Sequence, residues 1–252
     1  FSKKEAPIQG LAGMGGGVPS RLLTLASGTT TYVDDVFSTF LWTGNSTNNR
    51  DIVNGIDLDG EGGLVWIKRR SGSDNHILYD TERGGSKFLS SDLTAAENSN
   101  DGLSFNSNGF RIALNSQAYT NPNGTTFCSW TFRKCPGFFD VVTYTGTGSV
   151  QNVSHNLGSE PGAIFIKKTS GSENWAVYHR STGNASPGKL NTTDQFNTSA
   201  NGHFNSTTPT DSVFTVKTDA TVNENGASYV AYLFAHNDGS FGEDSDEAVI
   251  KC

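Results

Sequence analysis

The five histidines are the most versatile chemical groups in the chain, yet their spacing indicates neither a catalytic nor a metal centre. They are His76, His155, His179, His203 and His236. No two have the His-x-x-x-His separation of a zinc site, and none lies beside a cysteine pair. Ser, His and Asp are all present, but no Gly-x-Ser-x-Gly elbow marks a nucleophilic serine. The sequence therefore predicts no catalytic residue, no metal ligand and no cofactor, and scattered surface histidines.

A short acidic stretch resembles the start of a calcium loop. Asp57 and Asp59 stand at the first and third positions of such a loop. The twelfth position is Lys68, where a bidentate Glu is needed. A turn that leads into the following strand accounts for the same Asp and Gly residues, and we favour it.

Sugar binding is the chemistry that the side-chain composition favours, because aromatic rings and polar side chains such as Asn and Asp bind sugars together. Trp175 and His179 are the candidate ligand-binding residues. Alternation along a strand places Trp175, Val177 and His179 on one face. A repeated segment puts His76 where the later copy has Trp175, and a position that accepts either residue is expected to be exposed. The alternative for Trp175 is partly buried packing at an edge.

Internal repetition is the most informative feature of the sequence. Residues 63–79 match residues 162–178 without a gap, at a separation of 99 residues. Residues 123–132 match residues 225–234 at a separation of 102. The unit is about 100 residues long, which is enough to bury its own core.

Residues that both copies retain are expected to hold turns and packing, and not chemistry. They are Lys68 and Lys167, Gly72 and Gly171, Asn75 and Asn174, Tyr79 and Tyr178, and Gly84 and Gly183. The same holds for positions that are aromatic in both copies. These are Trp42 and Tyr144, Trp66 and Phe165, and Trp130 and Tyr232.

The elements that carry these residues are predicted to be strands. Residues 64–67 and 163–166 are apolar on both faces, which is typical of central strands. Each precedes a Ser-Gly-Ser turn and a second apolar run, as in a hairpin. Residues 94–97 are the one place where a turn of helix is expected. The predicted fold is all-β, with two tandem antiparallel β-sandwich units of jelly-roll or lectin-like type; a single shared sandwich is the alternative.

The chain is predicted to have four parts. Residues 1–34 are a Gly/Ser/Thr-rich arm or linker, and residues 35–137 are the first sandwich, which ends at a Cys-Pro-Gly hinge. Residues 138–236 are the second sandwich. Residues 237–252 are a linker or the start of a further element.

Composition excludes several classes of function. The net charge is −7, and the densest basic run is residues 68–70, so we expect no nucleic-acid binding. No apolar run approaches the ~20 residues of a membrane span, so we expect no membrane insertion. The three cysteines do not form a disulfide framework. Cys128 is expected to share a core face with Trp130 and Phe132, and Cys135 is expected to be a free thiol.

Four ordered motifs carry a resemblance to a known family. They are residues 143–148, 155–162, 164–168 and 175–181, and the first copy matches through residues 64–72 and 79–84. This series resembles a repeat of bacteriophage tail-fibre and virion structural proteins, many from phages of aquatic bacteria, including cyanobacteria. The resemblance implies a β-rich structural domain and supplies no catalytic residues. By analogy with phage fibres it implies a homotrimer.

We therefore expect a non-enzymatic virion structural protein of a tail fibre or similar external appendage, which contributes to host-surface glycan attachment outside the cell. Its expected partners are copies of itself, other virion proteins and host surface glycans. One alternative is a purely structural decoration, knob or spacer. The other is a polysaccharide-cleaving enzyme of the tailspike type.

Overall fold

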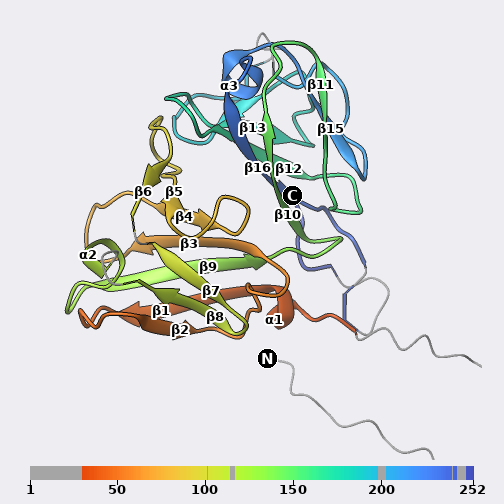
Figure 1. Ribbon diagram of the computed structural model, residues 1–252. Helices are drawn as coiled ribbons and strands as arrows, with labels where there is room; N and C mark the ends of the chain where they lie inside the picture. Colours follow the sequence, from red (N-terminus) through yellow and green to blue (C-terminus); the bar gives the residue numbers. More distant parts are fainter. Residues whose placement is uncertain (1–29, 101, 114–116, 198–202, 240, 243–247) are drawn as a thin grey trace, which may run out of the picture.

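The computed structural model describes residues 30–100, 102–113, 117–197, 203–239, 241–242 and 248–252. Within them the chain is all-β, with 16 strands in antiparallel sheets and three helices of four residues each. Figure 1 shows two stacked halves, the first coloured red to yellow-green and the second green to blue. Of the predicted arm, residues 1–29 lie outside the described residues. No helix in the described part of the chain has the length and apolar character needed to cross a membrane.

The first half consists of a large sheet backed by a smaller one. The large sheet has the order β1 (Phe37–Thr43), β9 (Thr126–Arg133), β3 (Gly63–Arg69) and β4 (Ile77–Asp80). The smaller sheet has the order β2 (Arg50–Val53), β8 (Gly109–Ile112) and β7 (Leu103–Asn106). Strands β5 (Lys87–Phe88) and β6 (Asn98–Ser99) form a separate pair, and the helices are α1 (Val33–Val36) and α2 (Gln117–Thr120).

The second half has a corresponding set of strands. Its large sheet has the order β10 (Phe139–Thr145), β16 (Ser228–Phe234), β12 (Ala163–Lys168), β13 (Ala176–His179) and β14 (Gly188–Lys189). Its smaller sheet pairs β11 (Gln151–Ser154) with β15 (Val213–Val216), and its helix is α3 (Ala220–Asn223).

The two predicted hairpins and central strands are confirmed. Strand β3 pairs with β4 on one side and with β9 on the other, and β12 lies likewise between β13 and β16. Both strands are apolar on both faces because each large sheet is covered on both sides. The predicted helical turn at residues 94–97 is wrong. Its backbone stays extended because the Glu97 N–H donates to Thr169 O and the Glu173 N–H donates to Thr94 O, both at 3.0 Å.

Three apolar clusters account for this coverage. One lies between the sheets of the first half and includes Trp42, Val65 and Phe110. Another lies between the sheets of the second half and includes Ile164 and Phe214. The third, which we call the inter-half core, joins the facing sides of the two large sheets. Its buried members are Val36, Leu64, Leu78, Leu89, Phe138, Phe139, Val141, Ala163, Trp175, Val230, Tyr232, Phe234 and Phe241.

Aromatic rings connect the two halves through the inter-half core. The Phe132 ring, from the first sheet, lies 5.4 Å from Phe139 and 5.6 Å from Phe234, both in the second sheet. Tilted and edge-to-face ring pairs at such separations add to the stabilisation that burial alone supplies. Phe132 therefore belongs to the packing between the halves.

The cysteines and the boundary between the halves follow from this packing. Cys128 is buried, as expected, and all three cysteines are free. Burial raises the pKa of the Cys128 thiol. The predicted hinge is a tight turn in which the Phe138 N–H donates to Cys135 O, and Phe138 is buried in the inter-half core. Residues 248–252 return to the second half, where the Asn237 N–H donates to Ile250 O.

Candidate functional site

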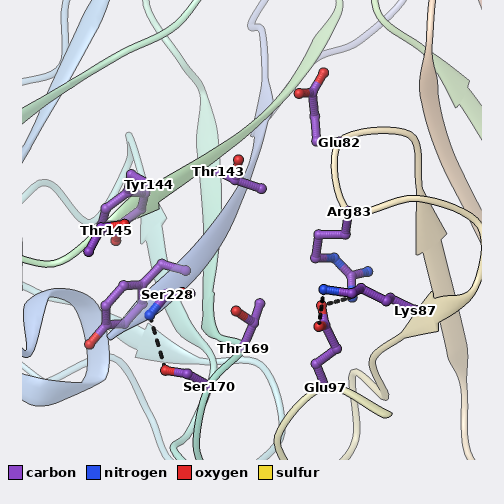
Figure 2. Close-up of a pocket in the computed structure, with 11 residues that line it drawn as sticks. Glu82, Arg83, Lys87, Glu97, Thr143, Tyr144, Thr145, Thr169, Ser170 and Ser228 are labelled. Carbon is purple, nitrogen blue, oxygen red and sulfur yellow. Dashed lines mark hydrogen bonds and ion pairs between the residues drawn. The ribbon is translucent and has the colours of Figure 1, made fainter. Parts of the chain in front are cut away.

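A polar cleft of about 440 Å³ opens between the two halves (Figure 2). One wall comes from the second half and is rich in hydroxyl groups, from Thr143, Thr145, Thr169, Ser170 and Ser228, with Tyr144 and Tyr229 beside them. The other wall comes from the first half and is charged, from Glu82, Arg83, Lys87 and Glu97. We call this space the inter-half cleft.

The hydroxyl wall exists because β10 ends and β16 begins with a small polar residue. Thr145 pairs with Ser228, and Thr143 pairs with Val230 one step further into the sheet. Paired residues of antiparallel strands point to the same side, so these hydroxyls share one face. The Ser170 hydroxyl accepts a hydrogen bond from the Ser228 N–H at 3.0 Å and closes the end of this wall.

The charged wall is backed by a buried ion-pair network that we call the Arg83 network. Arg83 Nε donates to Asp80 Oδ2 at 2.7 Å, and Arg83 Nη1 donates to Glu97 Oε2 at 3.1 Å. The Tyr232 hydroxyl of the second half donates to Asp80 Oδ2 at 2.7 Å and accepts from Arg83 Nη2 at 3.2 Å. Burial raises the pKa of Tyr232 well above its ordinary value, so the hydroxyl keeps the proton that it donates. The network therefore ties the halves together.

The inter-half cleft offers hydrogen bonds but no recognisable catalytic pair. Both oxygens of Glu97 are engaged, one by Arg83 and the other by Lys87 at 3.0 Å. Glu82 pairs with Lys134 at 2.7 Å, and Figure 2 shows its side chain directed away from Glu97. Glycoside cleavage needs two carboxyl groups that flank one bond. The lining residues of the cleft include neither His nor Cys, so a nucleophile with an imidazole base is not assembled there.

A second hollow, of about 300 Å³, lies on the first half beside α2. Its lining residues are Arg69, Asp74, Asn75, Ile77, Phe88, Ser90, Leu93, Asn98, Tyr119 and Pro122. Tyr119 is 60% exposed, the largest exposed fraction among the large apolar and aromatic residues that the structure describes. Phe88 packs on the buried ring of Tyr79 at a centroid distance of 5.9 Å. We call this space the Tyr119 hollow.

Comparison with known proteins assigns the fold that carries both spaces to a family. Residues 33–243 match the domain of unknown function DUF7483. The chain belongs to the DUF7483 family. The match covers both halves, so one DUF7483 domain contains the two large sheets and the inter-half core between them. No curated protein matches the chain, and no solved structure does.

The expectation that Trp175 is exposed is wrong for this DUF7483 domain. Its exposed fraction is 0%, its ring stacks on Tyr232 at 6.1 Å, and its Nε1 donates to Ser90 O at 2.9 Å. The reason is that its face of the sheet is turned toward the other half, not toward solvent. Its counterpart His76 is also partly buried, and its Nδ1 accepts from Trp66 Nε1 at 2.8 Å. Trp175 therefore offers no ring face to a ligand.

His179 is half-buried at the end of β13, where its Nδ1 lies 2.7 Å from the Ser181 hydroxyl. It lies in neither the inter-half cleft nor the Tyr119 hollow. Ligand binding by His179 stays a prediction.

Two further expectations from the sequence have clear outcomes. His155 is not a surface residue, since it is buried against Phe214 and burial lowers its pKa. Asp57 caps a turn, because its Oδ1 accepts from the Gly60 N–H at 2.9 Å. In the described part of the DUF7483 domain, no three His, Cys, Asp or Glu side chains are grouped to hold a metal ion.

Proposed function

We propose that the chain is a non-enzymatic structural module of a phage appendage, such as a tail fibre, that helps to attach the particle to host-surface glycans. The observation that carries the proposal is the inter-half core, which makes one continuous body of two large sheets. Because the two halves are packed into one body, the polar residues on its surface are held in fixed positions, as attachment to another surface requires. Attachment of this kind needs no catalytic group. The ordered motifs of the tail-fibre repeat support the virion setting.

We also propose that the domain arose as two tandem β-sandwich units with boundaries near residues 35–137 and 138–236. Equivalent hydrogen bonds recur at the repeat separation of 102 residues. Trp42 Nε1 donates to Thr120 O at 3.1 Å, and the Tyr144 hydroxyl donates to Val222 O at 2.6 Å. The donors differ in chemistry but occupy corresponding strands, β1 and β10, and each bonds to a carbonyl in the short helix of its own half, α2 or α3.

A second pair of contacts supports the same duplication. Asn121 Oδ1 accepts from the Asn45 N–H at 3.2 Å, and Asn223 Oδ1 accepts from the Thr147 N–H at 2.7 Å. Asn121 directly follows α2, Asn223 is the last residue of α3, and both are fully buried. Buried amides are retained where each of their polar atoms finds a partner.

The attachment role is tested with purified protein and polysaccharide from the host surface. Binding without release of reducing ends is the expected result, because the inter-half cleft lacks a pair of opposed carboxyl groups. Release of reducing ends would instead support the enzymatic alternative. Binding of no host polysaccharide, with an intact fold by circular dichroism, would leave a purely structural decoration, knob or spacer.

The proposed setting has its own test. Analytical ultracentrifugation of the chain is expected to show a homotrimer, as in phage fibres. Labelled antibodies against the domain are expected to mark an external appendage on intact particles, in contact with other virion proteins. Labelling of the particle interior alone would contradict the proposal.

A further inference from the structure

The Tyr119 hollow differs in its residues from the equivalent place in the second half. Leu78 lies opposite Leu89, and Val177 lies opposite Gly188, so this region keeps the separation of 99 residues. At the helices α2 and α3, the hydrogen-bonded residues Thr120 and Val222 keep the separation of 102. Five apolar or aromatic residues line the hollow, namely Ile77, Phe88, Leu93, Tyr119 and Pro122. The corresponding residues of the second half are Ala176, Pro187, Thr192, Thr221 and Glu224.

These differences change the polarity and the charge of the surface beside the short helix. In the second half, Lys168 forms an ion pair with Glu224 beside α3. In the first half, Pro122 stands where Glu224 would be, so Arg69 pairs with Asp74 of its own hairpin turn at 2.6 Å. The two charges of the hollow thereby neutralise one another and leave a site without net charge.

An unpaired amide also separates the two places. In the second half, Asn191 Nδ2 donates to Asn174 Oδ1 at 2.9 Å. The residue equivalent to Asn191 is Asp92. Each accepts a backbone N–H, Asn191 from Trp175 and Asp92 from His76. The Asp92 carboxylate, however, has no N–H group that could donate to Asn75. Among the described residues, the Asn75 amide consequently has no hydrogen-bond partner, and the Asn98 amide has none either. Amides without an internal partner in an aromatic-lined hollow are suited to the hydroxyl groups of a bound molecule.

We propose that the Tyr119 hollow is the glycan-binding site and that it takes a neutral oligosaccharide. One sugar ring stacks on the exposed face of Tyr119, and its hydroxyls bond to the amides of Asn75 and Asn98. A hollow of about 300 Å³ lies at the lower end of the range for small-molecule sites. This inference rests on the proposed attachment role, because it locates the glycan that the attachment role requires.

The test is isothermal titration calorimetry of the full chain with neutral hexose di- to tetrasaccharides and with the matching uronic-acid oligosaccharides. We expect Tyr119→Ala to weaken binding of the neutral series at least tenfold, and Tyr119→Phe to leave it nearly unchanged. Thr221→Ala, at the equivalent place in the second half, is the matched control and is expected to change affinity less than twofold. Asn75→Asp, which keeps the shape and removes the donor, is expected to weaken binding several-fold.

The outcomes separate the site from the function. If the wild-type chain binds the sugars and Tyr119→Ala binds equally well, the hollow is not the site, while the attachment role stands. If the uronic-acid series binds more tightly than the neutral series, the inference of a neutral ligand is overturned. If no oligosaccharide or host polysaccharide binds, both proposals fail. Circular dichroism of each variant excludes loss of the fold as the cause of lost binding.

Discussion

Replacing Arg83 by Met is the most direct perturbation of the contact between the halves. The Arg83 side chain is 3% exposed, and that of its partner Asp80 is 0% exposed. Met fills much of the same volume but leaves the Asp80 carboxylate with only two donors, the Tyr232 hydroxyl and the backbone N–H at position 83. Removing one partner of a buried ion pair typically costs about 3–5 kcal/mol, because the remaining charge has lost both water and its counter-charge.

The loss is large relative to the stability of a domain, which is about 5–15 kcal/mol. For a chain of this size, it corresponds to a fall in melting temperature of roughly 2–4 °C for each kcal/mol. The assay is urea unfolding followed by tryptophan fluorescence, with the midpoint and slope compared between wild type and Arg83→Met. The exposed pair of Arg111 and Asp51, with N···O 2.7 Å, provides the control. Arg111→Met is expected to leave the midpoint nearly unchanged, since solvent screens exposed pairs.

A double variant separates lost charge pairing from lost packing. Asp80→Asn with Arg83→Met removes both charges, so it is expected to cost less than the sum of the two single changes. The reasoning would be refuted if Arg83→Met lost no more stability than Arg111→Met, or if the two changes at the buried pair were strictly additive. Either result would mean that Asp80 and Arg83 do not stabilise the domain as a buried ion pair.

Three further predictions concern a buried indole, a buried lysine and two turn glycines. Trp175→Ala is expected to lower the free energy of unfolding by about 3–5 kcal/mol in urea unfolding, because it removes a fully buried indole. Burial lowers the pKa of Lys167 to about 8. Between about pH 8 and the ordinary Lys pKa, the unfolded state therefore binds more protons than the folded state. Lys167 thus makes the free energy of unfolding rise with pH over that range. Lys167→Met is expected to reduce this rise in unfolding curves measured at a series of pH values. Gly84→Ala and Gly183→Ala are each expected to lower the free energy of unfolding by about 1–2 kcal/mol in thermal unfolding. Both positions have positive φ (85° and 76°), and a Cβ there would have free space, so the cost is the backbone strain alone. A large cost at one position only would argue against equivalent turns.

The strands were readable from the sequence because their signals are local. Runs such as residues 64–67 and 163–166 are apolar on both faces, and a Ser-Gly turn follows each at a fixed distance. Residues 94–97 show where local reasoning fails. Their composition favours a helical turn, but backbone bonds to residues about 75 positions later keep them extended. Tertiary hydrogen bonds of this kind leave no periodic pattern in either segment.

The packing of one half on the other explains why the expected ligand-binding residue was misplaced. Alternation along a strand shows which residues share a face, but it does not show whether that face packs on another sheet or meets solvent. Trp175 differs from its counterpart His76, and this difference favours an exposed position. The structure gives another reason, because the two positions face opposite sides of one interface and each has its own neighbours there.

The sequence marks the Arg83 network and the Tyr119 hollow by positions that differ between the two matching segments, and not by a motif. Under the proposed duplication, Asp80 and Arg83 stand where the second copy has His179 and Thr182, and Tyr119 stands where it has Thr221. Positions that both copies retain, such as Gly84 and Gly183, hold the backbone. Positions that differ are free to take on roles that only one half performs.

Under the proposed duplication, the positions that differ between the copies fall into two groups, those between the two large sheets and those that face solvent. Where the two large sheets face each other, differences produce complementary partners, as when Tyr232 of one half completes the ion pair of Asp80 and Arg83 in the other. Such residues fix the halves in one arrangement, and the halves are then no longer interchangeable. Where the sheet ends face solvent, no partner constrains the change, so Tyr119 and Pro122 line a hollow, while Glu224 at the equivalent place pairs with Lys168. The buried differences therefore explain why the domain is one body, and the exposed ones include the hollow where we propose that it binds a glycan.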